Sequence, residues 1–446
     1  MENFNIHKIK GWKAFKKSLE LPNDPINFFV KELNDFGDFI NYKILHLNFY
    51  FIFDPDIIKY VLQENNSNYK KSVFYKELER LIGKGLVTGE GKLWKKNRRL
   101  AQKAFKKSSI EEFSKIFYEE SDIISKEWQA KDELDISKEM MKVTFRIVGK
   151  ALFSSNLDIY AKSIDENLTK ALESITIRTQ SLPAIPYFLP TKTNRQLKKA
   201  INEINKITDE IISERIESKI RTNDLLDSLI YSIDEETGES MDPKQIKDET
   251  ITFLAAGHET TSNALTWTFY LLSKHPEIRK QVIEEIKNNI PSEERITIQD
   301  IEKLDLTSRV LKESLRLLPP AWIIERNSIG EDVLRGEKIP AGSIVSICTY
   351  GVHRNPKHWN DPEKFDPDRF LPEEEAKRHK FAYIPFGGGP RVCIGNNFAF
   401  AEAMIILSTI YRNYEPILVA NHPVEMEPLV TLRPKHGMKM VLNRKS

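Results

Sequence analysis

The sequence predicts a mainly α-helical protein with a small β-rich region. Apolar residues recur at helical spacing over most of residues 109–222, and this periodicity indicates amphipathic helices. A further helix over residues 242–274 would be about 48 Å long, enough to cross a whole domain. Aromatic and β-branched residues gather instead in residues 39–53 and 333–348, which predicts short strands there.

Caps and prolines give the boundaries of the helices. Asp242 is a good N-cap, and Pro243 suits the first helical position after it. Three prolines in residues 181–190 cannot lie inside a helix, so a break is predicted there. Outside that break, helices are predicted at residues 94–105, most of 109–222, 224–231, 242–274, 276–289, 307–318 and 396–412.

The composition is that of a globular protein with a large core. The 446 residues are 40% hydrophobic and 30% charged, with a net charge of +2, so nothing favours nucleic acid as a partner. Only two residues are cysteines, so no disulfide framework is expected. The expected location of the protein is therefore a reducing cytoplasm. The start of the chain shows neither an apolar run of roughly 20 residues nor the core of a secretory signal. We therefore expect a soluble protein without a membrane anchor.

Residues 386–395, FGGGPRVCIG, place a cysteine in a glycine-rich loop just before a predicted helix. A helix N-terminus presents unpaired N–H groups and the positive end of the helix dipole, and both favour a thiolate at Cys393. A thiolate is a good soft ligand for iron. A lone cysteine more often serves packing, but an ordered set of residues here favours a metal ligand: Phe386, Gly389, Arg391, Cys393 and Gly395.

This ordered set resembles the haem-binding loop of the cytochrome P450 family, F-x-x-G-x-R-x-C-x-G, with every fixed position matched. The resemblance covers about residues 35–440 and implies the cytochrome P450 fold. It also implies a single domain over residues 1–446, with an N-terminal segment of about residues 1–34. Haem b, iron protoporphyrin IX, would lie between the long helix and the loop, with Cys393 as the iron ligand.

The long helix contains the sequence AGHETT at residues 256–261. Glycine costs about 1 kcal/mol relative to alanine inside a helix, and threonine hydroxyls can bond back to the i−4 carbonyl. A tolerated polar patch is the plain alternative, but small Ala256 and Gly257 would let a flat ligand lie against the backbone. The stretch resembles the family motif [AG]-G-x-[DE]-T-T, which binds dioxygen. The resemblance makes Thr260 a hydrogen-bonding residue and Glu259 a proton relay.

Trp94 and Arg98 are four residues apart in a basic stretch and share a helix face. The stretch could be an ordinary solvated helix. In the family, however, a W-x-x-x-R pair hydrogen-bonds a haem propionate, and other cations of this helix form a docking face for an acidic electron donor. The resemblance implies further haem contacts for Ala256, Gly257, Arg326, Phe386, Arg391 and Gly395, and secondarily for His353.

Glu313 and Arg316 lie three residues apart in a predicted helix, so the two side chains can pair. This spacing alone is uninformative. Their position about 77 residues before Cys393 resembles the E-x-x-R motif of the family, which Arg369 would complete. The resemblance implies that the three residues form a structural triad joined by charge-assisted hydrogen bonds.

The substrate pocket is predicted only from the resemblance of segments. The candidate lining residues are Arg178, Gln180, Tyr187, Phe188, Phe253, His258, Trp322 and Ile323. This set is more polar than a pocket for a fatty acid or steroid. We therefore expect a small polar substrate, such as a methylated sugar or another methoxy compound, that undergoes O-demethylation. The alternatives are that Arg178 and Gln180 face solvent, or that a fatty acid or other lipophilic substrate is hydroxylated.

The function implied by the resemblance is that of a haem-thiolate monooxygenase. Dioxygen would be one substrate, and electrons would come from NAD(P)H through a ferredoxin or flavodoxin-type donor and its reductase, since nothing resembling a reductase follows Ser446. Abundant Lys, Ile and Asn suggest a bacterial source. Two alternatives remain: a peroxide-driven relative, against which the Glu259 and Thr260 pair argues, and a haem protein that only binds ligand or senses gas.

Overall fold

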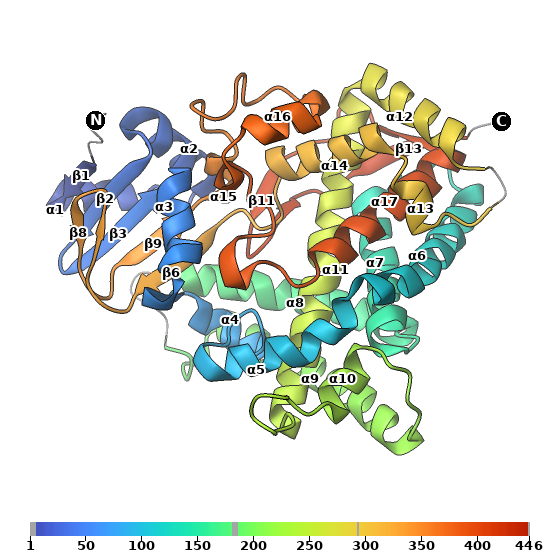
Figure 1. Cartoon of the computed structure of the whole chain (residues 1–446), viewed down its shortest axis with the longest axis horizontal. Coiled ribbons are helices and arrows are strands. Elements are labelled where there is room, and N and C mark those ends of the chain that lie inside the picture. The colour runs from blue at the N-terminus through green and yellow to red at the C-terminus, as the bar shows by residue number, and fades with distance from the viewer. Residues whose placement is uncertain (1–5, 181–185, 292–293, 445–446) are drawn as a thin grey trace. The chain divides into compact units, whose positions relative to one another are not determined.

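The computed structural model describes residues 6–180, 186–291 and 294–444, drawn in Figure 1. The chain forms two compact units. The strand-rich unit comprises Met1–Lys76 and Lys312–Cys393, and the helical unit comprises Glu77–Leu311 and Ile394–Ser446. Long helices and several small sheets confirm the predicted fold class. That the whole chain acts as one domain stays a prediction.

The strand-rich unit contains a six-stranded sheet with the order β1-β2-β3-β9-β6-β4. β2 and β3 form the hairpin predicted for residues 39–53, whereas β1 runs parallel to β2 and β9 runs parallel to β3. A separate hairpin joins β7 to β8. The strands are β1 His7–Lys10, β2 Phe39–Ile44, β3 Leu47–Ile52, β4 Tyr69–Lys71, β6 Ile324–Ser328, β7 Asp332–Leu334, β8 Glu337–Ile339 and β9 Ile344–Ile347.

Short helices complete the strand-rich unit. Asp54 caps the start of α3, because this carboxylate accepts hydrogen bonds from the N–H groups of Asp56 and Ile57. A short π-helix follows over Tyr60–Glu64. The α-helices are α1 Gly11–Ser18, α2 Pro25–Phe36, α3 Pro55–Lys59, α15 Thr349–Val352 and α16 Pro372–Lys377. Two others, α4 Tyr75–Ile82 and α14 Asp305–Leu317, have residues in both units.

The helical unit is built around α11, Pro243–Lys274, which packs against α7, α9 and α17. Its 32 residues match the predicted span, and the Asp242 side chain caps it by accepting from the Gln245 N–H. The other helices are α5 Gly91–Gln102, α6 Lys107–Glu127, α7 Ile136–Phe153, α8 Asp158–Gln180, α9 Lys192–Ser218, α10 Leu225–Tyr231, α12 Pro276–Asn289, α13 Ile298–Ile301 and α17 Asn396–Asn413.

Two small sheets lie in the helical unit. β10 Tyr414–Leu418, β13 Lys439–Arg444 and β5 Glu133–Asp135 form one, and β11 Met426–Pro428 with β12 Leu432–Pro434 forms a hairpin. The predicted break between helices falls between α8 and α9, and residues 181–185 of it lie outside the described residues. None of the helices that the structure describes is long and apolar enough to cross a membrane.

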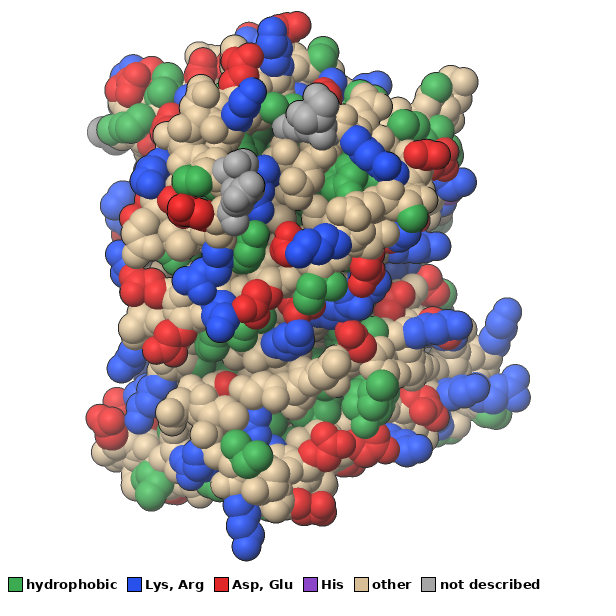
Figure 2. All heavy atoms as spheres, turned by 90° about the vertical axis from the view of Figure 1, so that its right-hand side faces the viewer, with side chains coloured by type: hydrophobic (Ala, Val, Ile, Leu, Met, Phe, Trp, Pro, Cys, Tyr) green, Lys and Arg blue, Asp and Glu red, His purple; other side chains and the backbone are tan. Residues whose placement is uncertain are grey.

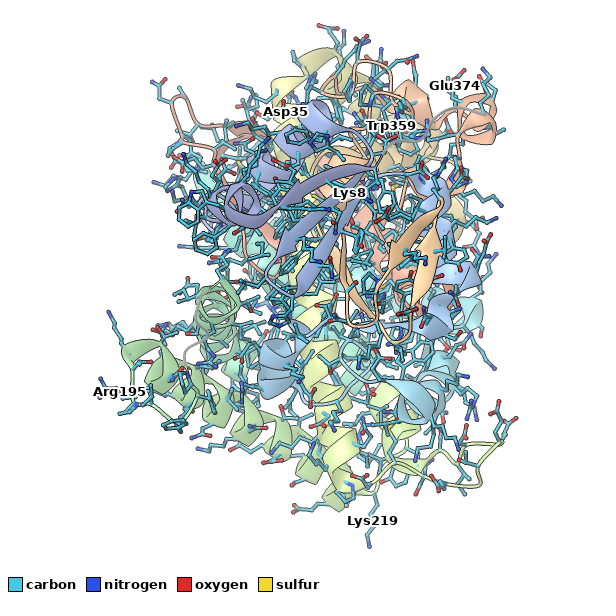
Figure 3. All side chains as sticks on the ribbon, turned by 90° about the vertical axis from the view of Figure 1, so that its left-hand side faces the viewer. Lys8, Asp35, Arg195, Lys219, Trp359 and Glu374 are labelled. Carbon is cyan, nitrogen blue, oxygen red and sulfur yellow. The ribbon has the colours of Figure 1, made fainter. Side chains whose placement is uncertain are left out.

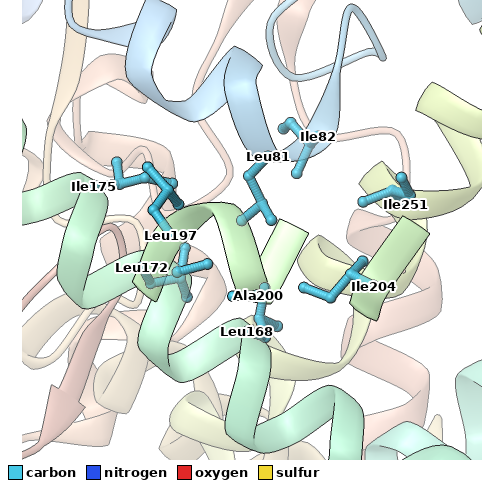
Figure 4. Close-up of a cluster of buried hydrophobic side chains, with 10 residues drawn as sticks. Leu81, Ile82, Leu168, Leu172, Ile175, Leu197, Ala200, Ile204 and Ile251 are labelled. Carbon is cyan, nitrogen blue, oxygen red and sulfur yellow. The ribbon is translucent and has the colours of Figure 1, made fainter. Parts of the chain in front are cut away.

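An apolar cluster joins four helices of the helical unit (Figure 4). Its buried members come from α4, α8, α9 and α11, and partly buried side chains, including Ala255 and Val430, pack against it. One face of the protein is mixed in charge: Figure 2 shows Lys and Arg side chains interspersed with Asp and Glu over the face it draws. This distribution agrees with the net charge of +2.

Candidate functional site

The loop that carries Cys393 is held by its own backbone. The Cys393 N–H donates to the Phe386 carbonyl at 2.9 Å, and the Val392 N–H donates to the Gly389 carbonyl at 3.1 Å. The Cys393 side chain is exposed, and α17 begins at Asn396 with Gly395 as its N-cap. The loop is therefore a closed backbone turn in which Cys393 stays accessible.

Two glycines of this loop have no room for a side chain. Gly389 has φ +64°, and a Cβ there would lie 1.9 Å from the Leu62 carbonyl oxygen in the π-helix. A Cβ at Gly388 would lie 2.6 Å from the Phe381 ring. The loop is thus packed closely against its own unit, which fixes the position of the Cys393 backbone.

The three residues predicted as a structural triad lie together in the strand-rich unit. Arg316 and Glu313 are fully buried and form two hydrogen bonds of 2.6 and 2.7 Å. Arg369 Nε lies 3.5 Å from Glu313 Oε1. Burial raises the pKa of Glu313, and the hydrogen bond from Arg316 opposes that rise. The pair is therefore a desolvated ion pair whose partners depend on one another.

Arg316 also forms hydrogen bonds with the backbone of residues 353–364. Its guanidinium donates to the carbonyls of His353, Pro362 and Lys364 at 2.9, 2.7 and 3.1 Å. In return, Glu313 accepts from the Asp366 N–H at 2.9 Å. The ion pair therefore ties the end of α14 to the chain that precedes the Cys393 loop.

His353 corrects one of our expectations. It is fully buried, and burial lowers its pKa to about 3, so the ring is neutral. Nδ1 lies 3.1 Å from the Arg316 carbonyl, and Nε2 accepts from the Ile384 N–H at 2.8 Å. Both ring nitrogens are engaged within the protein, so His353 positions the backbone at Ile384 and has no N–H to give a propionate.

The other residues of the strand-rich unit that we predict to contact haem differ in how far they are buried. Arg326 is buried on β6, with Nη1 donating to the Glu325 carbonyl at 2.9 Å. Beside it, burial raises the pKa of Glu325 to about 7, and the Ser346 hydroxyl donates to this carboxyl at 3.0 Å. Phe386 and Arg391 are half-buried in the loop. Sequence patterns had not drawn attention to Glu325.

Ala256 and Thr260 form an open strip on α11, a helix whose middle is otherwise mostly buried. Ala256 is exposed and Thr260 is half-buried. The Thr260 hydroxyl donates to the Ala256 carbonyl at 2.8 Å, which is the predicted bond to the i−4 carbonyl. A small side chain and a hydroxyl on one accessible strip fit a flat ligand lying against the helix.

Gly257 lies at a close contact between two helices. A Cβ at Gly257 would lie 3.1 Å from Val148 Cγ2, on the neighbouring helix α7. Since real Cβ atoms rarely come so close, the missing side chain allows α7 and α11 to approach each other. Gly257 therefore supports helix packing, and its predicted contact with haem stays a prediction.

Glu259 is buried and turned toward the β11–β12 hairpin. Its Oε1 accepts from the Thr431 hydroxyl at 2.7 Å, and the Asn263 side-chain amide donates to Thr431 Oγ1 at 3.3 Å. Burial raises the pKa of Glu259 to about 7, while the bond from Thr431 opposes the rise. No local pattern predicts Thr431, which lies 172 residues away in the chain.

Replacing Thr431 by Val should raise the pKa of Glu259 further, by about one unit, because a hydrogen bond to a carboxylate is lost. Carboxyl ¹³C NMR of glutamate-labelled protein, with Glu259→Gln to assign the signal, measures this pKa directly. Thr431→Ser keeps the hydroxyl and should retain the wild-type value. An unchanged pKa in Thr431→Val would show that this hydroxyl does not control Glu259.

On α5, Trp94 is buried and the Arg98 guanidinium lies 5.8 Å from the centre of its ring. Several other cations of this helix pair with an acidic loop at residues 234–239. Arg99 Nε and Nη2 donate to Asp234 at 2.7 and 2.8 Å, and Lys96 Nζ donates to Glu239 at 3.0 Å. Lys95 stays exposed. The basic face is therefore partly neutralised, which the sequence alone did not indicate.

The polar substrate candidates lie inside the helical unit and have internal partners. Arg178 is buried, with Nε 2.5 Å from Glu77 Oε2 and Nη1 hydrogen-bonded to Asn194. His258 is buried and bonds through Nδ1 to the Leu254 carbonyl. Burial lowers the pKa of His258 to about 4. Both residues therefore support the protein interior, which corrects their assignment to a pocket wall.

The remaining candidates are mostly aromatic or apolar. Phe253 is buried and stacks on Phe105 with ring centres 5.5 Å apart. In the strand-rich unit, Trp322 is buried, and the centre of its ring lies 6.4 Å from the centre of the Phe29 ring. Ile323 is half-buried. The other three occupy less enclosed positions: half-buried Gln180 at the end of α8, half-buried Tyr187 and exposed Phe188.

Comparisons with known proteins agree with the motifs. The family model described as Cytochrome P450 matches residues 10–440. Protein LUTEIN DEFICIENT 5, chloroplastic, of Arabidopsis thaliana is 30% identical, over 90% of this chain and 71% of its own. Two Streptomyces proteins are similarly related. Cyclooctat-9-en-7-ol 5-monooxygenase of S. melanosporofaciens is 32% identical over 86% of this chain and 83% of its own. Pentalenene oxygenase of S. avermitilis is 31% identical over 95% of this chain and 90% of its own.

Proposed function

Because the chain belongs to the cytochrome P450 family of haem-thiolate monooxygenases, we propose that it hydroxylates a lipophilic, terpene-like substrate. Two of its relatives carry names of terpenoid oxygenases, cyclooctat-9-en-7-ol 5-monooxygenase and pentalenene oxygenase. A fatty acid is a second candidate substrate of the same lipophilic class. O-demethylation of a methylated sugar or other polar methoxy compound is the competing proposal, and the experiment below separates the two.

The observation that carries the lipophilic substrate is that polar candidates for the pocket are engaged inside the protein, whereas chain neighbours of the motif residues pack on an apolar cluster. Ala255, next to Ala256, packs against the apolar cluster of Figure 4, and so does Val430, next to Thr431. The argument for a polar substrate rested on Arg178 and His258, whose polar atoms are engaged internally. Apolar walls with few polar groups are typical of sites for lipophilic ligands.

Each unit by itself offers residues that suit a haem: the strand-rich unit has an exposed cysteine, a soft ligand, and the helical unit has an open helix strip, a flat surface. When bound, the haem supplies the activation of dioxygen. Cys393 would bind the iron, with backbone N–H groups near Gly395 moderating the thiolate. The propionates would be held by Trp94, Arg98, Arg326 and Arg391.

Glu259 and Thr260 would move protons toward the dioxygen side of the haem. A carboxyl whose pKa is about 7 is partly protonated at neutral pH, so it can both give and take a proton. Its hydrogen bond to Thr431 holds it away from solvent. The Thr260 hydroxyl, one residue further along α11, would form a hydrogen bond on the dioxygen side of the haem, at the open strip.

Electrons would come from NAD(P)H through an external donor of the ferredoxin or flavodoxin type and its reductase. An acidic donor needs exposed cations to dock. On α5, Lys95 is exposed, whereas Lys96 and Arg99 are paired with the acidic loop at residues 234–239. We therefore place the main docking contribution of α5 at its exposed lysines, Lys92 and Lys95.

A ligand screen by difference spectroscopy tests the substrate class. Terpene alcohols, terpene hydrocarbons, fatty acids and methylated sugars are each titrated into the haem-loaded protein, and turnover is then measured with a surrogate ferredoxin and reductase. Spectral shifts and hydroxylated products from the apolar panel are expected. Binding and demethylation of the methoxy compounds alone would overturn the lipophilic proposal in favour of its competitor.

Thr260→Ala is expected to lower the product formed per reduced cofactor consumed about tenfold, with haem content unchanged. This loss corresponds to about 1.4 kcal/mol, which one or two hydrogen bonds can supply. Peroxide should accumulate in place of product. Thr260→Ser keeps the hydroxyl and should remain close to wild type. Equal coupling in Thr260→Ala and wild type would remove Thr260 from proton delivery.

A further inference from the structure

Glu249 is a fully buried carboxyl in the first half of α11 that the reaction proposed above does not use. Its hydrogen bonds with the described residues come from N–H donors. Oε2 accepts from the Leu86 N–H at 3.0 Å, and Oε1 accepts from the Asn97 side-chain amide at 2.9 Å. The Gln245 side-chain amide, one turn earlier on α11, lies 3.4 Å from Oε1. Glu249 therefore connects α11 to α5 and to the loop that precedes α5, residues 83–90.

The loop of residues 83–90 lies directly on α11. Gly83 has φ +62°, and a Cβ there would lie 2.0 Å from Asp248 Cγ. A Cβ at Gly85 would lie 2.1 Å from Thr252 Oγ1. Only glycine allows so close an approach to the helix at both positions. Because α5 begins directly after this loop, contacts with α11 set the start of α5.

Asn97 extends the same connection into the middle of α5. Its side chain is fully buried, three residues after Trp94 and one before Arg98, the two residues of α5 that we propose hold a haem propionate. The Asn97 amide nitrogen donates to Glu249, whereas Oδ1 has no hydrogen-bond partner in the part of the chain that the structure describes. An unpaired oxygen is costly inside a protein. The bond to Glu249 therefore determines how the Asn97 side chain is oriented.

The orientation of Asn97 depends on the charge of Glu249. Burial raises the pKa of Glu249 to about 7, and the bonds from the Leu86 N–H and the Asn97 amide oppose that rise. In the ionised form both carboxyl oxygens accept hydrogen bonds, which is the arrangement in the structure. Protonation turns one of these oxygens into a donor that faces an N–H group. The Asn97 amide would then turn over, so that its unpaired Oδ1 accepts the new proton.

The charged side chains around Glu249 do not neutralise it. Those on α11, α5, α9 and α10 form ion pairs elsewhere: Asp248 with Lys244, Lys247 with Asp209, Asp227 with Arg215, and Lys96 and Arg99 with the loop at residues 234–239. Figure 3 shows α9, with Arg195 near its start and Lys219 just after its end, crossing the first half of α11. On the loop before α5, Lys84 is exposed. Among the described residues, Glu249 therefore has hydrogen-bond donors but no ion-pair partner.

We propose that Glu249 is a positioning residue for haem binding: through Asn97 it holds α5, and with it Trp94 and Arg98, in the orientation that meets the propionates. This role rests on the propionate contacts proposed above for Trp94 and Arg98, and it adds a dependence on pH. Ionised Glu249 keeps Asn97 in its present orientation, so haem is held firmly above neutral pH. Protonation, as the pH falls below about 7, releases Asn97 and weakens the hold on haem.

Haem release to an excess of apomyoglobin, followed by absorbance, measures how firmly the chain holds its cofactor. Glu249→Gln has the shape of the protonated acid. At a pH of about 8 it should release haem about tenfold faster than wild type, the effect expected from one hydrogen bond to a charged group. The wild-type rate should rise as the pH falls from about 8 to about 6, whereas the rate of Glu249→Gln should stay high throughout.

A reciprocal exchange identifies Asn97 as the partner of Glu249. Asn97→Asp alone places two carboxyls together and should also release haem about tenfold faster. The double variant, Asn97→Asp with Glu249→Gln, has the same shape and again pairs one carboxylate with one amide. It should return to within about threefold of the wild-type rate. Lys247→Gln, on the same helix and paired with an exposed carboxylate, is the control and should release haem like wild type. Circular dichroism and haem content check that each variant is folded and loaded.

Arg98→Gln separates the role of Glu249 from the propionate contact on which it rests. This variant should release haem faster at every pH. If it does not, the propionate contact fails, and the role of Glu249 fails with it. If Arg98→Gln releases haem faster but Glu249→Gln does not, the positioning role is overturned while the propionate contact stands. A double variant that releases haem as fast as the single variants would overturn the positioning role in the same way.

Discussion

Cys393→Ser is expected to eliminate the red-shifted carbon monoxide spectrum of a thiolate-ligated ferrous haem and, with it, monooxygenase turnover. A serine hydroxyl stays protonated at neutral pH and is a hard, weak ligand, whereas a cysteine near a helix N-terminus is readily deprotonated. The exposed position of Cys393 leaves its sulfur accessible to a metal. Spectra of the reduced protein with carbon monoxide, at matched haem content, provide the measurement.

Cys348 offers a matched control for this substitution. It is fully buried, and burial raises the pKa of its thiol to about 12, so it remains a neutral packing group. Cys348→Ala should therefore keep the thiolate spectrum while losing some stability. If the spectrum survived in Cys393→Ser and vanished in Cys348→Ala, the iron ligand would have been assigned to the wrong cysteine.

Glu313→Gln is expected to lower the free energy of unfolding by about 3–5 kcal/mol, because it leaves the Arg316 guanidinium buried without its counter-charge. Both side chains are fully buried, so solvent cannot compensate. Asp366 would also lose a carboxylate acceptor for its N–H. Urea unfolding of the purified variant, followed by circular dichroism, measures the change.

The control for Glu313→Gln lies on the same helix. Asp305 and Arg309 form an ion pair of 2.8 Å in which the carboxylate is mostly exposed. Asp305→Asn should therefore cost less than about 1 kcal/mol. Similar losses from both substitutions would mean that burial of the Glu313 and Arg316 pair does not set its importance.

The features that the sequence predicted well are local in the chain. The ends of α11 follow from Asp242, Pro243 and Pro276, since caps and prolines act within one helical turn. The family follows from a ten-residue loop, and the comparisons confirm it. The roles given to Cys393 and Thr260 rest on such short motifs and stay predictions that the substitutions above will test.

The tertiary structure decided which polar side chains are available for chemistry. Arg178 suggested a polar pocket until its pairing with Glu77 placed it in the interior, and the space that Gly257 leaves for Val148 of α7 is visible only in the folded chain. Thr431, the hydrogen-bond partner of Glu259, carries no signal in the sequence. The sequence by itself determined the family, the ends of α11 and the motif residues, because those depend on neighbours in the chain. Which groups are buried, paired or left open depends on contacts between distant segments, and only the folded chain brings those segments together.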